Sequence, residues 1–93
     1  MDDVYAQIAE RIISRQEAII GPVAIEQAEQ VHELHIDWSK HAVIISGNGV
    51  KAIDLLIERY KDLFGQVSVE VSKEAAHSLV GKLTPEQLPN MLK

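Results

Sequence analysis

The sequence predicts a small, mainly helical domain with a short β-hairpin at its centre, in the order helix, helix, strand, strand, helix, helix. Apolar residues recur at helical spacing in several segments, and they alternate with polar residues for a short stretch after position 34. Glycine and proline separate these segments. A chain of 93 residues has room for one hydrophobic core, so we expect a single domain spanning residues 1–93.

The first two helices are expected over residues 2–20 and 22–33. Apolar residues keep the helical period through residue 20, and the aspartates at positions 2 and 3 complement the positive end of the helix dipole. Gly21 interrupts this pattern. Pro22 suits the first turn of a second helix, where its missing N–H has no intrahelical partner.

A two-stranded hairpin is expected over residues 34–46. Leu34, Ile36 and Trp38 alternate with polar residues, and a short run rich in branched side chains follows at residues 42–45. Trp38 is the only tryptophan of the chain. We expect it to anchor the core, and the alternative is the centre of an exposed interface.

The strongest helical signal lies in residues 49–64, with Asn48 as the natural N-cap and Gly65 as the stop. Its apolar residues recur at steps of three and four and form one broad stripe: Val50, Ile53, Leu56, Ile57, Tyr60, Leu63 and Phe64. This stripe should face the core. The charged residues, including Asp54, fall mainly on the opposite face and are expected to meet water.

Residues 66–82 carry conflicting signals. Val67, Val69 and Val71 alternate with polar residues, which favours a strand. The chain also aligns with itself at an offset of 44 residues, and this offset places Gly21 on Gly65. The matched segment after Gly21 is predicted helical, so we predict a helix over 66–82 and a pseudo-twofold repeat of helical hairpins. The alternative is an α+β fold with a third strand at 66–71.

The C-terminal segment, residues 84–93, is expected to form a turn and a tail. Thr84, Pro85 and Gln87 have the pattern of a capped helix start, and Pro89 stops it. The tail is apolar for a chain end, so it either packs on the core or forms an interface through three residues: Leu88, Met91 and Leu92.

Composition restricts the classes of function. The formal net charge is -5, without a run of Lys or Arg, which disfavours nucleic acid and anionic membrane as partners. The N-terminus is acidic and no apolar run approaches the roughly 20 residues that span a bilayer. The chain has no cysteine, so disulfides and thiolate metal sites are excluded. We expect a cytoplasmic protein.

Two features are weak candidates for binding chemistry. His32, His35 and His41 lie near carboxylates and include the residue types that bind zinc, but the His-Glu-Leu-His spacing differs from that of metalloproteases. Gly47, Asn48 and Gly49 precede a helix as a phosphate cradle does, but they lack the Gly-Lys-Ser/Thr ending. We expect ordinary histidines, a glycine turn, and no cofactor.

The sequence carries no catalytic motif, and an enzyme has no positive support. The first hypothesis is a non-catalytic interaction or regulatory module that acts through protein–protein contacts as a homodimer. The second is a small-ligand or metal-binding protein that uses the histidines or the glycine turn. The third is an enzyme that acts only as an oligomer, with its pocket between chains.

Overall fold

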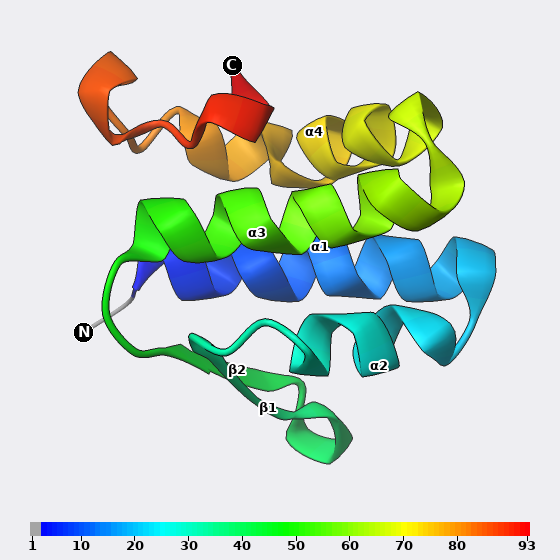
Figure 1. The fold of residues 1–93 in the computed structure, drawn as a ribbon. Coiled ribbons are helices and arrows are strands. Elements are labelled where there is room, and N and C mark those ends of the chain that lie inside the picture. The colour runs from blue at the N-terminus through cyan, green and yellow to red at the C-terminus, as the bar shows by residue number, and fades with distance from the viewer. Residues whose placement is uncertain (1–2) are drawn as a thin grey trace.

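The computed structural model describes residues 3–93 and confirms the mainly helical fold and its order of elements (Figure 1). The elements are α1 (Val4–Ile20), α2 (Val23–Glu29), β1 (Leu34–Asp37), β2 (Ala42–Ile45), α3 (Gly49–Phe64) and α4 (Gln66–Val80). Short 3₁₀ turns occupy Trp38–Lys40, Pro85–Gln87 and Asn90–Leu92. The expected start of the first helix at residue 2 lies outside the described residues.

Helices α1 and α3 form the middle of the molecule (Figure 1). Helix α4 and the C-terminal turns cover one side, and α2 with the hairpin covers the other. Helix α1 contacts the three other helices and β2. The largest fully buried apolar side chains come from the two middle helices: Ile8, Ile12, Ile13, Ile53, Leu56, Ile57 and Tyr60. One core therefore joins all the elements.

The two strands pair antiparallel, from Leu34 opposite Ile45 to Asp37 opposite Ala42. The expectation that Trp38 lies on a strand is wrong, because the strand ends at Asp37 and a 3₁₀ turn begins at Trp38. His41 closes this turn in the left-handed conformation, at φ 49°. The tight turn reverses the chain before the alternation can continue.

Residues 66–71 are helical, which excludes the third strand of the alternative fold. Helix α4 packs on α1, with small or medium side chains buried at Ser68, Val69, Ser72 and Ala76. The valine alternation is therefore compatible with a helix whose buried side is small. Helix α2 is shorter than expected, since it ends at Glu29 and residues 30–33 form a turn.

The expected caps are present. Asn48 Oδ1 accepts a hydrogen bond from the Lys51 amide at 3.1 Å, which begins α3. Asp3 Oδ1 accepts from the Tyr5 amide at 2.9 Å at the start of α1. The Thr84 amide donates to Gln87 Oε1 at 2.9 Å, as the capping-box pattern predicts.

The C-terminal tail is held against the core. The Asp54 carboxylate accepts hydrogen bonds from the backbone amides of Asn90 at 3.2 Å and Met91 at 2.8 Å. The Tyr5 hydroxyl donates to the Gln87 carbonyl at 2.7 Å. The expected solvation of Asp54 is therefore wrong: this half-buried carboxylate caps the last 3₁₀ turn from a neighbouring helix.

Candidate functional site

The three candidate histidines each engage a different part of the structure. His35 Nε2 lies 3.1 Å from Ser46 Oγ, and His41 Nδ1 lies 3.3 Å from Glu10 Oε2. His32 is exposed and lines a shallow pocket beside α3. Across residues 3–93, no three or more His, Cys, Asp or Glu side chains are grouped so that they could hold a metal ion. The contacts seen for His35 and His41 are structural.

The glycine turn before α3 serves packing and capping. Gly47 has φ 88°, which a side chain rarely tolerates. Gly49 lies directly under the Tyr5 ring, because a Cβ at Gly49 would fall 2.5 Å from a carbon of that ring. Asn48 already satisfies the Lys51 amide. Backbone conformation, packing and capping thus account for the glycine pattern.

Trp38 fastens the hairpin turn to α1. Its indole N–H donates to Glu17 Oε1 at 3.1 Å, and its ring stacks on His41 with centroids 4.1 Å apart. His41 in turn contacts Glu10. Trp38 is half-buried and packs against the core, so its contacts within the chain account for its position.

The tail residues named as interface candidates pack on the chain's own core. Leu92 is buried, and Leu88 and Met91 are half-buried against the core cluster. The sequence left open whether this tail docks internally or elsewhere. Within this chain it docks internally, through the two amides held by Asp54.

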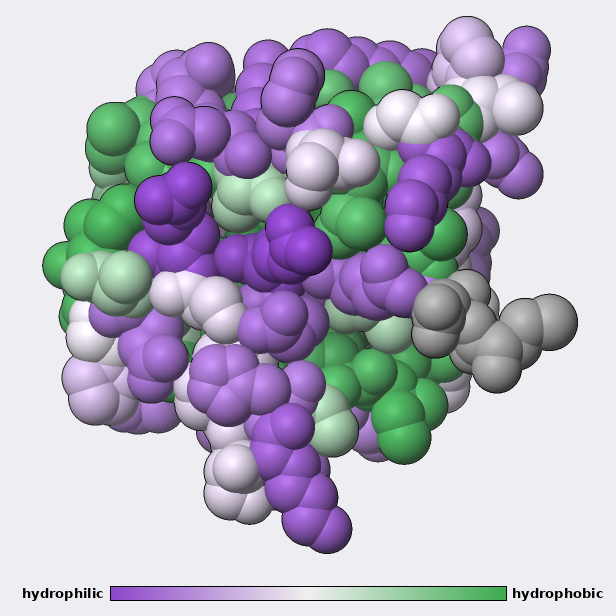
Figure 2. Space-filling view, turned by 180° about the vertical axis from the view of Figure 1, so that it is seen from behind, coloured by the Kyte–Doolittle hydropathy of each residue, from purple (hydrophilic) through white to green (hydrophobic). Residues whose placement is uncertain are grey.

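A group of exposed apolar side chains lies elsewhere. Five large hydrophobic side chains within the described residues are exposed, and four of them lie where α1 and α3 end and α4 begins: Ile19 (60% exposed), Leu63 (52%), Phe64 (39%) and Val67 (65%). We call these four residues the end patch. Both helical links turn at this end of the molecule (Figure 1), and apolar side chains gather at the left of the opposite view (Figure 2).

The end patch corrects the expectation that the whole stripe of residues 49–64 faces the core. Ile53, Leu56, Ile57 and Tyr60 are buried, but the last turn of α3 is not. The chain reverses at Gly65, and no element within residues 3–93 covers the outer side of this turn. The stripe thus continues from the core onto the surface.

The residues of the end patch come from two uncharged stretches, residues 18–25 and 63–69. Gln16, two residues before the first stretch, contacts the second, because its Nε2 donates to the Ser68 carbonyl at 3.1 Å. The sequence signal for this surface was the absence of charge around the two glycine links, in a chain with 25% charged residues.

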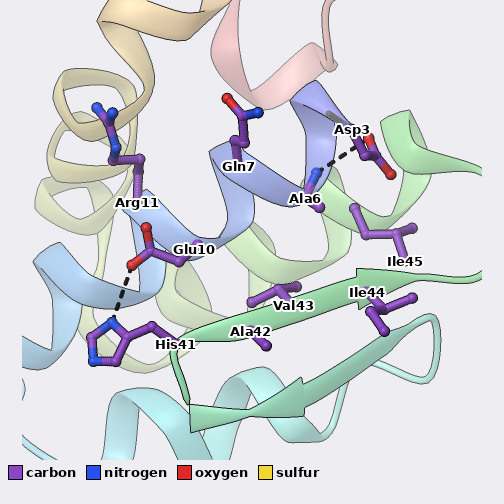
Figure 3. Close-up of a pocket in the computed structure, with 10 residues that line it drawn as sticks. All are labelled: Asp3, Ala6, Gln7, Glu10, Arg11, His41, Ala42, Val43, Ile44 and Ile45. Atoms are coloured by element: carbon purple, nitrogen blue, oxygen red, sulfur yellow. Dashed lines mark hydrogen bonds and ion pairs between the residues drawn. The ribbon is translucent and has the colours of Figure 1, made fainter. Parts of the chain in front are cut away.

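A second feature that the sequence did not reveal is a groove between α1 and β2 (Figure 3). It is open to solvent and has a volume of about 580 Å³. Residues 41–45 form one wall, and one face of α1 forms the other: Asp3, Ala6, Gln7, Glu10 and Arg11. The groove is a candidate binding surface because it is concave and lined by both polar and apolar side chains.

Comparisons with known proteins add no assignment: no protein-family model, curated protein or solved structure matches this chain. None of the helices within residues 3–93 is both long and apolar enough to cross a membrane.

Proposed function

We propose that this protein is a small, non-catalytic interaction module that pairs with a second copy of itself through the end patch. The observation that carries this proposal is the exposure of Ile19, Leu63, Phe64 and Val67 at the end of the molecule where both helical links turn (Figure 1). Large exposed apolar patches on small proteins mark interaction sites, because covering them removes apolar area from water.

The charge distribution favours a second copy as the partner. The chain has a net charge of -5, yet residues 18–25 and 63–69 contain no charged residue. Interface cores are depleted in charge, and a strongly charged partner would find no complementary group on this surface. Two copies that meet here bring uncharged surfaces together and keep their like-charged surfaces apart. A twofold arrangement covers both patches at once.

The non-catalytic part of the proposal is supported by the use of the polar side chains. Glu17 accepts from Trp38, and Glu10 contacts both Ser14 and His41. Asp54 holds the tail through two backbone amides. These groups fasten one element to another, which is a structural use.

Sedimentation equilibrium from low to high micromolar concentration tests the proposal. We expect the native protein to be a dimer, and Leu63→Lys or Val67→Lys to be monomers that keep their helical circular dichroism. Ile44→Lys is the matched control, because Ile44 is also apolar and 67% exposed but lies on the hairpin. This variant should remain a dimer. A native protein that is monomeric at high micromolar concentration overturns the proposal.

A further inference from the structure

The outer edge of β2 presents unpaired backbone groups. The Ser46 amide donates to the Glu33 carbonyl at 2.9 Å, which extends the register of the hairpin by one pair. Bonded pairs alternate along an antiparallel ladder, so Ala42 and Ile44 direct their N–H and C=O groups toward β1. Val43 and Ile45 direct theirs to the other side, away from β1.

This outer side opens on the groove between β2 and α1 (Figure 3). Within residues 3–93, no backbone hydrogen bond joins Val43 or Ile45 to α1. The four residues of β2 span about 13 Å at the usual strand rise. The edge is therefore a short template on which another extended chain can pair.

From this geometry we infer that the groove binds an extended, basic segment of a partner protein, which pairs with β2 as a third strand. Strand addition of this kind draws its affinity from main-chain hydrogen bonds and its specificity from alternate side chains. The inference concerns a surface separate from the end patch and does not depend on self-association.

The charges of the groove define the chemistry of the segment. Asp3, at the N-cap of α1, and Glu10, on α1, bring carboxylates to the groove. Each already has contacts within the chain, since Asp3 Oδ1 accepts from the Tyr5 amide and Glu10 Oε2 lies 3.3 Å from His41 Nδ1. Arg11 also lines it, but its guanidinium donates to Ser78 Oγ on α4 at 3.2 Å and points away from β2 (Figure 3). Lys or Arg on the incoming strand would complement the two carboxylates. A second copy, with its net charge of -5, is the less suitable occupant.

Apolar contacts are available on both sides of the edge. The Ile44 side chain is 67% exposed on the outer face of the hairpin, and Ala6 leaves room on the side of α1. A segment whose basic residues flank small or β-branched residues fits both requirements. Cross-strand pairs of β-branched side chains add to the stability of such a ladder.

Nuclear magnetic resonance titration with three synthetic peptides tests the inference on the full chain. The first peptide is Lys-Val-Thr-Val-Lys, whose palindromic sequence makes the result independent of strand direction. It should protect the Val43 and Ile45 amides from hydrogen exchange. The acidic peptide Glu-Val-Thr-Val-Glu should bind roughly tenfold more weakly. The peptide Lys-Pro-Thr-Pro-Lys lacks two N–H donors for the β2 carbonyls, so it should bind more weakly than the first peptide and protect these amides less at the same concentration.

Variants separate this site from the end patch. Val43→Pro removes one outward N–H and leaves the ladder to β1 intact, so the basic peptide should bind about five- to tenfold more weakly. Ile44→Lys should also weaken this peptide while the oligomeric state is kept. Leu63→Lys should change the oligomeric state and leave peptide binding unchanged.

Three results overturn the inference. The first is that the basic peptide leaves the Val43 and Ile45 amides unprotected at millimolar concentration. The second is equal binding of the basic and acidic peptides. The third is protection of both amides in the native protein alone that increases with its concentration, because a second copy would then occupy the edge.

Discussion

Gly21 and Gly65 adopt the same backbone conformation, with φ 78° and ψ -158° at the first and φ 81° and ψ -168° at the second. Each amide donates to the carbonyl four residues earlier, at Glu17 and Lys61. The two glycines are 44 residues apart, which is the offset at which the chain aligns with itself. The two helical hairpins therefore reverse direction by the same local geometry.

This conformation is essentially restricted to glycine, so Gly21→Ala and Gly65→Ala should each lower the free energy of unfolding by about 1–3 kcal/mol. A Cβ at either position meets no atom within 4 Å, and the cost is therefore conformational. Gly81→Ala is the control, because Gly81 has helical φ -62° and equally open surroundings. It should be neutral or stabilising by about 0.4–1 kcal/mol. Urea unfolding of the three variants measures these changes. Equal changes in the free energy of unfolding for all three would contradict the prediction.

The sequence was sufficient to predict features that depend on residues adjacent in the chain. Asn48, Thr84 and Gln87 form the caps expected of their positions, and the glycine links end the helices that precede them. For residues 66–80 the local valine alternation pointed to a strand. Comparison with the segment after Gly21 pointed to the helix that the structure contains.

The sequence was insufficient where burial depends on distant elements. Phe64 lies on the same helical stripe as Tyr60, yet Phe64 is 39% exposed and Tyr60 is buried. The two residues differ in burial because α3 ends at Phe64, where the chain turns into α4. Asp54 lies on the polar side of the same helix, but the folded tail brings the amides of Asn90 and Met91 to it. The groove beside β2 arises only when α1 packs near the hairpin.

Asp54→Ala should loosen the C-terminal tail. The substitution removes both acceptors of the Asn90 and Met91 amides, and we expect a loss of about 1–2 kcal/mol in the free energy of unfolding. Hydrogen exchange at these two amides should accelerate more than exchange in α3. Asp62→Ala, on an exposed position of the same helix, is the control and should stay within about 0.5 kcal/mol of the native protein. Unchanged exchange at Asn90 and Met91 would contradict the capping role.

Gln16→Glu should destabilise the contact between α1 and α4. Gln16 is buried and its Nε2 donates to the Ser68 carbonyl and to Ser72 Oγ. An ionised carboxylate cannot donate and would face a carbonyl oxygen, so the loss near neutral pH should be about 3 kcal/mol.

The loss caused by Gln16→Glu should diminish as the pH falls. Burial raises the pKa of a carboxyl group in the folded state, and its protonated form can donate again. The exposed substitution Gln30→Glu is the control and should be nearly neutral at every pH. Guanidinium unfolding at several pH values measures both variants. Equal free energies of unfolding for Gln16→Glu and Gln30→Glu at every pH would refute the prediction.

Tyr60 should make the fold sensitive to alkali. Its hydroxyl donates to the Ala24 carbonyl at 2.7 Å, and burial raises the pKa of Tyr60 above the ordinary value of 10.0. In the unfolded chain the phenol ionises near pH 10, whereas the fold holds it neutral. The unfolded state therefore releases this proton first, and stability should fall as the pH rises above about 10.

Tyr60→Phe separates the two contributions of this hydroxyl. At neutral pH the variant should be less stable by about 1–2 kcal/mol, because the Ala24 carbonyl loses its donor. Above pH 10 the difference in stability between the native protein and the variant should narrow, since only the native protein releases a Tyr60 proton on unfolding. Tyr5→Phe is the comparison. Desolvation by burial and the nearby Asp3 raise the pKa of Tyr5, but Tyr5 is less buried than Tyr60, so Tyr5→Phe should change the pH dependence of stability less. Denaturant midpoints from neutral to alkaline pH test this, and parallel curves for the native protein and Tyr60→Phe would show that ionisation of Tyr60 is not the cause.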